Sequence, residues 1–168
     1  MPQRPPQLDS PVVPAVIKVM SRAQAWVYKR TGGRVGGTWR VGAGFRKPVP
    51  TLLLEHRGRK SGKTFTVPLL YMTSGPEGPG TGDPLRDDLV VVASQGGLPG
   101  DPQWYRNLVA GPDAAVQVGR TRREVRAHVA DAQERERLWP ALVTLYADFD
   151  DYQSWTERTI PVVVLRAR

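Results

Sequence analysis

Residues 51–73, TLLLEHRGRKSGKTFTVPLLYMT, predict a β-hairpin. The two halves, residues 51–57 and 64–73, are rich in the aliphatic, β-branched and aromatic residues that favour strands. The turn between them holds Gly58 and Gly62, which allow a positive φ angle and a close approach of the backbone. Because strands joined by a short turn run antiparallel, the segment favours an antiparallel sheet.

The chain that follows this hairpin extends the same architecture. Residues 74–87 are rich in glycine and proline and predict a surface loop. The run LVVVA then predicts a strand that is buried on both faces. The further elements that we expect are strands over 88–94, 114–118, 123–129 and 160–165, and helices over 102–109, 132–146 and 152–155. Asp101 and Asp131 are candidate N-caps. Since most neighbouring strands are joined by hairpins, we expect a mainly β (α+β) fold, a partly closed barrel of about six antiparallel strands with helices at its side.

The N-terminal third has a different pattern. Residues 1–11 hold four prolines and predict a disordered tail, and residues 12–30 place apolar side chains at helical spacing between Lys and Arg. Residues 31–50 are glycine-rich and predict a flexible connector to a barrel domain over 51–168. Two interpretations of the basic amphipathic helix remain open. It packs on its own domain, or it lies on an anionic lipid surface.

Composition and charge limit the classes of function. The chain has 168 residues and no cysteine, which excludes disulfides, thiol catalysis and cysteine-bound metals, and its two histidines do not favour a metal site. Residues 1–60 hold 12 Lys and Arg against two acidic residues, so an anionic partner is expected. The sequence contains no apolar run of about 20 residues and no secretory signal. We therefore expect a cytoplasmic protein, and the basic helix adds the hypothesis of peripheral contact with the inner face of the cell membrane.

Four segments carry side chains suited to binding or chemistry. GRKSGK at 58–63 offers cations and donors for a phosphate or carboxylate, and ASQGG at 93–97 ends a strand with paired glycines. DPQWYRNL at 101–108 places Trp104 and Leu108 on one helix face. LYADFDDYQSW at 145–155 spaces three aromatic residues for one face. Each segment also has an ordinary interpretation, namely a solvated hairpin tip, a simple turn, a helix that packs its tryptophan and a core stripe.

The order and spacing of these segments resemble the deazaflavin-dependent nitroreductase family. The matching segments are GRKSG, PLLYM, VVVASQGG, DPQWYRNL, ERLWPALVTLY and DYQSWTERTIPVVVL, with GGTW at 36–39 as an extension. The resemblance implies a split β-barrel of the FMN-binding type and coenzyme F-420, an 8-hydroxy-5-deazaflavin with an oligoglutamate tail. It also implies hydride transfer from the reduced deazaflavin to a quinone-like or nitroaromatic acceptor. A polyanionic tail accounts for the basic third of the chain without nucleic acid.

The resemblance implies roles for individual residues as well. The phosphate and tail are expected at Arg59, Lys60 and Ser61. The residues expected around the deazaflavin ring are Thr66, Val67, Pro68, Leu69, Ala93, Ser94, Gln95, Trp104, Tyr105 and Asn107. The acceptor is expected beside Leu70, Tyr146, Phe149 and Tyr152, with Ser94, Tyr146 and Tyr152 as catalytic hydroxyl donors. Phe65 and Gln95 stand where basic residues are frequent in the family, and Leu70 and Phe149 stand where tyrosines are frequent.

Two other functions compete with this hypothesis. An FMN-binding split barrel would need one phosphate site, whereas the deazaflavin needs an extended basic track. A non-enzymatic basic module would bind nucleic acid or an anionic membrane. Nucleic acid is not expected, because base stacking requires aromatic side chains near the basic third. Only Trp26, Tyr28, Trp39 and Phe45 lie there.

Overall fold

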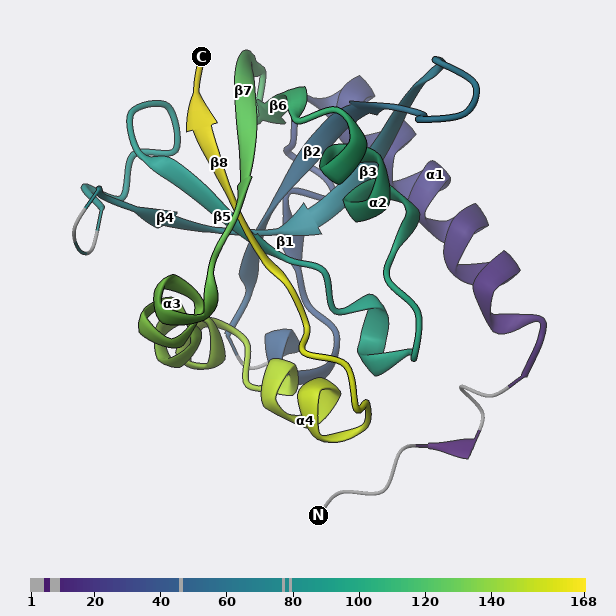
Figure 1. Cartoon of the computed structure of the whole chain (residues 1–168). Coiled ribbons are helices and arrows are strands. Elements are labelled where there is room, and N and C mark those ends of the chain that lie inside the picture. Colours follow the sequence, from purple (N-terminus) through teal and green to yellow (C-terminus); the bar gives the residue numbers. More distant parts are fainter. Residues whose placement is uncertain (1–4, 7–9, 46, 77, 79) are drawn as a thin grey trace.

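A computed structural model describes residues 5–6, 10–45, 47–76, 78 and 80–168 (Figure 1). The predicted tail over 1–11 lies largely outside the described residues. The elements, in chain order, are α1 (Val13–Thr31), β1 (Thr38–Trp39), η2 (Gly42–Phe45), β2 (Val49–Arg57), β3 (Thr64–Leu70), β4 (Met72–Ser74), β5 (Asp88–Val92), η3 (Gln95–Gly97), α2 (Gln103–Ala110), β6 (Asp113–Val118), β7 (Thr121–Val129), α3 (Ala132–Leu145), α4 (Asp148–Ser154) and β8 (Val162–Ala167).

The strands form one curled antiparallel sheet, which confirms the predicted α+β fold. The order across the described part of the sheet is β1-β2-β6-β7-β8-β5-β4, and β3 pairs with β2 off this path. The predicted strand over 64–73 is divided at Tyr71, which is buried and donates its backbone N–H to Pro50 O at 3.2 Å. As a result β3 pairs with β2, while β4 pairs with β5. This division and the two-residue β1 raise the strand number above the expected six.

Two hydrophobic clusters lie on opposite faces of the sheet. Along β5, Leu89 and Val91 belong to one cluster, and Val90 and Val92 belong to the other. This alternation confirms the predicted burial of the strand on both faces. The buried residues of the barrel cluster are Leu52, Leu54, Tyr71, Leu89, Val91, Ala93, Trp104, Leu108, Val116, Val125, Val163 and Leu165. Those of the helix-side cluster are Val49, Val90, Val92, Leu138, Leu142, Tyr146, Phe149, Ile160, Val162 and Val164, and α3 and α4 cover them (Figure 1).

Helix α1 is attached to the sheet through its C-terminal half. Tyr28 is 1% exposed, packs with Ala25 and Leu53, and its hydroxyl accepts the Gly119 N–H at 2.8 Å. The N-terminal half is exposed, and Val19 and Met20 are 66% and 64% accessible. The segment 31–50, predicted as a flexible connector, contains β1 and the start of β2, which pair at Thr38–Pro50 and Trp39–Val49. No helix within the described ranges combines the length and the apolar character that a membrane crossing requires.

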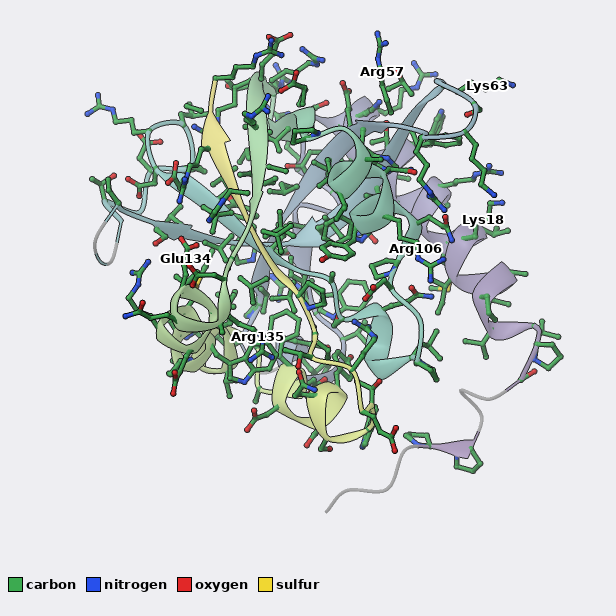
Figure 2. The ribbon with its side chains drawn as sticks, in the orientation of Figure 1. Lys18, Arg57, Lys63, Arg106, Glu134 and Arg135 are labelled. Carbon is green, nitrogen blue, oxygen red and sulfur yellow. The ribbon has the colours of Figure 1, made fainter. Side chains whose placement is uncertain are left out.

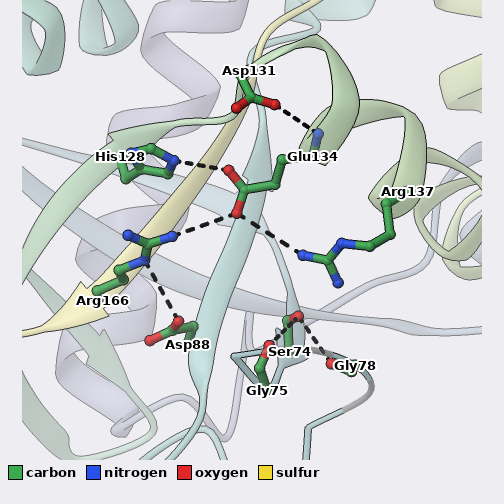
Figure 3. A network of polar contacts seen from close by, with 9 residues as sticks. All are labelled: Ser74, Gly75, Gly78, Asp88, His128, Asp131, Glu134, Arg137 and Arg166. Carbon is green, nitrogen blue, oxygen red and sulfur yellow. Dashed lines mark hydrogen bonds and ion pairs between the residues drawn. The ribbon is translucent and has the colours of Figure 1, made fainter.

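A polar network ties α3 to the neighbouring strands (Figure 3). Asp131 accepts the Glu134 backbone N–H at 2.8 Å, which confirms the predicted N-cap. The Glu134 carboxylate lies 2.8 Å from His128 Nε2 on β7 and 3.5 Å from Arg166 Nη2 on β8. Arg166 also approaches Asp88 of β5 at 3.8 Å. These contacts orient α3 over the helix-side cluster, from which the chain continues into α4.

Candidate functional site

A cavity of about 610 Å³ lies between α1, α2 and the turn end of the β2–β3 hairpin. Each of these elements contributes cations or hydrogen-bonding groups to its wall. Its lining residues are Lys18, Ser21, Arg22, His56, Gly58, Arg59, Lys60, Ser61, Phe65, Thr66, Val67, Gln103, Trp104, Arg106 and Asn107. Figure 2 shows Lys18 on α1 and Arg106 on α2 facing this region from two sides. The cavity therefore joins segments that are far apart in the sequence.

The hairpin turn at residues 58–63 is closed by its own backbone. Gly58 N–H donates to Lys63 O at 2.8 Å, and Gly62 N–H donates to Gly58 O at 2.7 Å. Gly62 has the positive φ of 66° that the sequence predicts. The Ser61 hydroxyl accepts the Lys63 N–H at 3.3 Å. This compact turn leaves the side chains of Arg59 and Lys60 on the cavity wall.

The cavity is strongly basic. Its lining includes the five cations Lys18, Arg22, Arg59, Lys60 and Arg106, and it includes no aspartate or glutamate. In the part of the chain that the structure describes, none of these five side chains lies within ion-pair distance of a carboxylate. Because uncompensated like charges in one concave site attract anions, the cavity is suited to a ligand with several negative charges.

Two side chains connect the turn to the interior. Asn107 Oδ1 accepts from Arg59 N at 3.2 Å and from Arg59 Nη1 at 2.8 Å. Asn107 Nδ2 lies 3.1 Å from Nδ1 of His56, and both residues are buried. Burial lowers the pKa of His56, so its ring is neutral at neutral pH. Arg59 is therefore held from α2 rather than by the hairpin alone.

The loop after β5 is held by an arginine that the sequence analysis did not single out. Arg158 Nη2 donates to Ala93 O at 3.1 Å and to Ser94 O at 2.9 Å, and Arg158 Nε donates to Leu98 O at 3.1 Å. Its Nη1 pairs with Asp101 at 2.9 Å. The prediction that Asp101 caps α2 is wrong, because this carboxylate binds Arg158 and α2 begins after Pro102 without a side-chain cap.

The same loop packs closely against α4. Gln95 has a φ of 46°, in the left-handed region that non-glycine residues rarely adopt. Gly97 follows with a φ of 76°, and a Cβ there would lie 3.1 Å from both Tyr152 Cα and the Trp155 ring. A side chain at this position would strain the backbone and crowd Tyr152 and Trp155, so glycine is favoured. The contact brings the turn that begins at Ser94 next to the helix that carries Tyr152.

The three aromatic residues of the predicted stripe gather around α4. The ring centroids of Tyr146 and Phe149 are 5.1 Å apart, and those of Phe149 and Tyr152 are 6.4 Å apart. Tyr146 and Phe149 are buried in the helix-side cluster, whereas Tyr152 is partly exposed. The hydroxyls of Tyr146 and Tyr152 are 3.4 Å apart, and Tyr146 also meets Trp39 Nε1 at 3.4 Å. Burial raises the pKa of both phenols, so both stay protonated.

The predicted site residues thus fall into four groups. Arg59, Lys60, Ser61, Thr66, Val67, Trp104 and Asn107 line the basic cavity. Leu69, Ala93 and Tyr105 join Val67 and Trp104 at the barrel cluster, whereas Leu70, Tyr146, Phe149 and Tyr152 belong to the helix-side cluster. Pro68, Ser94 and Gln95 form the fourth group, because they are partly exposed and lie outside the cavity wall. The basic periodicity of residues 12–30 was a signal for Lys18 and Arg22 as cavity residues. The cavity residues that were not predicted from the sequence are Lys18, Ser21, Arg22, His56, Gln103 and Arg106.

Comparison with known proteins identifies the family of this chain. Residues 20–167 match the family model described as F420H(2)-dependent quinone reductase. The chain belongs to this family. A candidate F420H(2)-dependent quinone reductase of Mycobacterium tuberculosis is 59% identical over 129 residues, which are 77% of this chain and 99% of that protein. An F420H(2)-dependent quinone reductase of the same organism is 36% identical, over 84% of this chain and 86% of that protein.

The chain is also similar to solved structures, one of which is a reductase that depends on F420-H2. An F420-H2 dependent reductase (FDR-A) is 34% identical with a TM-score of 0.57, over 70% of this chain and 94% of that chain. A chain described as a domain-swapped dimer has the same identity and TM-score, over 70% of this chain and 80% of that chain. The protein is therefore an oxidoreductase with a split-barrel fold, and its family uses coenzyme F-420. The basic cavity fits this cofactor, since a phosphorylated oligoglutamate tail needs several cations and no opposing carboxylate.

Proposed function

We propose that the protein reduces a quinone with coenzyme F-420, and that the basic cavity holds the anionic part of the cofactor. The observation that carries this proposal is a cavity with five cations and no carboxylate in its lining. Quinones are the acceptors named for its M. tuberculosis relatives. Reduced F-420, when bound, supplies a hydride in a single two-electron step.

In this proposal the turn and the two helices hold the cofactor's anionic groups. Arg59, Lys60 and Ser61 would hold the phosphate and the first part of the tail from the hairpin. Lys18, Arg22 and Arg106 would extend the track along α1 and α2. The length of this track favours an oligoglutamate tail over the single phosphate of FMN.

The ring is assigned to the barrel side of the sheet, and the acceptor is assigned to the place where the loop after β5 meets α4. Thr66, Val67, Pro68 and Leu69 would line the deazaflavin from β3. The remaining wall would come from Ala93, Ser94, Gln95, Trp104, Tyr105 and Asn107. The acceptor would lie toward Leu70 and α4, where Tyr152 is the partly exposed member of the aromatic group. Its hydroxyl would donate to the acceptor oxygen, Tyr146 would orient that hydroxyl, and Ser94 offers a second donor. We expect slower reduction of nitroaromatic acceptors than of quinones, because Leu70 and Phe149 lack the hydroxyls of the tyrosines that are frequent at these positions in the deazaflavin-dependent nitroreductase family.

Titration with oxidised F-420 and with FMN, followed by fluorescence, tests the proposal. F-420 should bind at least about tenfold more tightly than FMN, and its affinity should fall with rising salt, because exposed charges are screened. Lys60→Ala should raise the F-420 dissociation constant about tenfold through the loss of one charge-assisted contact at an exposed position. Lys63→Ala is the matched control, because Lys63 lies in the same turn but outside the cavity wall, and its backbone bonds survive the change. Equal affinity for FMN and F-420 would contradict the assignment.

The exposed half of α1 supports a second part of the proposal, which concerns location. We propose that this face rests on an anionic lipid surface, where a quinone is available. Val12, Val19, Met20 and Trp26 are each at least 60% exposed, and basic residues lie between them on the helix. An apolar stripe flanked by cations binds the interface of anionic membranes.

Point substitutions on α1 test this location without unfolding the protein. Truncation of α1 would remove Tyr28 from the core, so we choose the double variant Val19→Glu with Met20→Glu. The wild type should sediment with phosphatidylglycerol vesicles and not with phosphatidylcholine vesicles, and the double variant should sediment with neither. Leu85→Glu is the control, because Leu85 is an exposed apolar residue outside α1. If the double variant still sediments with phosphatidylglycerol vesicles, α1 is not the contact.

A further inference from the structure

The proposed function gives no role to His56, a buried polar residue of the cavity wall. His56 is 6% exposed and lies near the end of β2. Its ring stacks on Phe65 of β3, with centroids 5.9 Å apart and planes 26° apart. Its Nδ1 lies 3.1 Å from Asn107 Nδ2. A buried imidazole that is aimed at one amide group requires an account of what that contact does.

The other side of the Asn107 amide fixes the direction of this hydrogen bond. Asn107 Oδ1 accepts two N–H donors from Arg59, at 3.2 Å from the backbone and 2.8 Å from the guanidinium. Since the oxygen must face Arg59, the NH₂ group faces His56 and donates to it. Nδ1 of His56 then acts as the acceptor, so the neutral ring carries its proton on Nε2.

We propose that His56 is a positioning residue for the anion-binding turn. By accepting from Asn107 it fixes the amide orientation, and the amide in turn holds the backbone and guanidinium of Arg59 at the cavity. Without that acceptor the Asn107 amide is free to rotate. After rotation its NH₂ group, instead of Oδ1, would face the N–H groups of Arg59, and both hydrogen bonds would be lost. The chain His56–Asn107–Arg59 therefore preorganises the turn before the ligand arrives. The inference rests on the proposed function for the identity of that ligand, but not for the hydrogen-bond chain.

Nitrogen-15 NMR of the cofactor-free protein tests the first step. The chain has two histidines, so His56→Gln assigns the imidazole signals unambiguously. At neutral pH the His56 signals should be those of a neutral ring protonated on Nε2. A ring protonated on Nδ1 would overturn the inference, because that nitrogen could not accept from Asn107. This measurement does not depend on F-420.

Cofactor affinity tests the second step. His56→Leu keeps an apolar side chain near Phe65 but removes the acceptor, and it should raise the F-420 dissociation constant about tenfold, the size of one lost hydrogen bond at a preorganised site. His56→Gln offers a carbonyl acceptor and should restore most of the affinity. In an Asn107→Leu background, His56→Leu should have no further effect, because the two residues act through one chain.

The outcomes separate this inference from the proposed function. Failure of the wild type to bind F-420 would end the proposed function and leave the NMR measurement to decide on His56. A wild type that binds F-420, together with a His56→Leu variant of equal affinity, would end the inference alone. If His56→Leu does not fold, the F-420 affinity of His56→Gln and the tautomer measured by NMR test the inference in its place. A folded His56→Gln that binds F-420 as weakly as His56→Leu would overturn the acceptor role.

Discussion

Replacement of Arg158 by leucine is expected to lower the free energy of unfolding by about 3 kcal/mol, because one partly buried cation would be lost from four partners. Its side chain is 16% exposed and binds Asp101 together with the carbonyl oxygens of Ala93, Ser94 and Leu98. The leucine would remove this donor from the Asp101 carboxylate and from the carbonyl oxygens of Ala93 and Leu98, whereas Ser94 O would keep the Gly97 N–H at 3.0 Å. The change should appear in urea unfolding as a lower midpoint with an unchanged slope.

Two further variants make the Arg158 experiment specific. Arg158→Lys keeps the charge but cannot span three carbonyls and a carboxylate with one ammonium group, so it should recover only part of the stability. Arg86→Leu is the control, because Arg86 is 82% exposed and forms one surface ion pair with Asp83. That control should change the stability by less than about 0.5 kcal/mol. A wild-type midpoint for Arg158→Leu would show that the loop does not depend on the arginine.

Loss of the Tyr152 hydroxyl is expected to reduce the rate of quinone reduction. Tyr152→Phe should lower kcat and kcat/KM for menadione together by about 30-fold, or about 2 kcal/mol, because in the proposed function this hydroxyl donates to the transition state and other donors remain nearby. The F-420 dissociation constant should not change. Because burial raises the pKa of Tyr152 from its ordinary 10.0, the hydroxyl stays protonated, and its donation should persist from neutral pH up to that value.

Tyr146→Phe provides the comparison for Tyr152. Tyr146 is 3% exposed, and its hydroxyl contacts Trp39 and Tyr152, so its loss should lower stability and reduce kcat less than Tyr152→Phe does. A wild-type rate in Tyr152→Phe would exclude the hydroxyl from catalysis. Should Tyr152→Ala also keep the wild-type rate, the ring does not touch the acceptor and the aromatic group is ordinary packing.

Local signals in the sequence were sufficient for most of the fold. The hairpin around residues 58–63, the double-sided burial of β5 and the Asp131 cap are each indicated by a short stretch of sequence, and the structure confirms all three. The division of the strand at Tyr71 was not predicted, because β-propensity continues through that residue. Its cause is pairing with different neighbours, β2 and β5, which local propensity does not contain.

The missed site residues act over long separations. The partners of Arg158 lie 57 to 65 residues earlier in the chain, and no periodicity connects them. The same arginine explains why the prediction that Asp101 caps α2 was wrong. A carboxylate near a helix start can accept from backbone N–H groups or from a guanidinium, and Asp101 accepts from Arg158. Lys18 and Arg22 were visible as basic residues, but only the folded chain places them opposite the turn at residues 58–63.

The alternation along β5 has a consequence for how this family can diversify. Val90 and Val92 pack beneath the proposed acceptor residues, whereas Val91 and Ala93 pack on the side assigned to the cofactor. A change at one position therefore alters one side of the strand and leaves the packing on the other side in place. During evolution, descendants of one ancestor could exchange one electron acceptor for another through alternate residues of a single strand while retaining the inherited coenzyme.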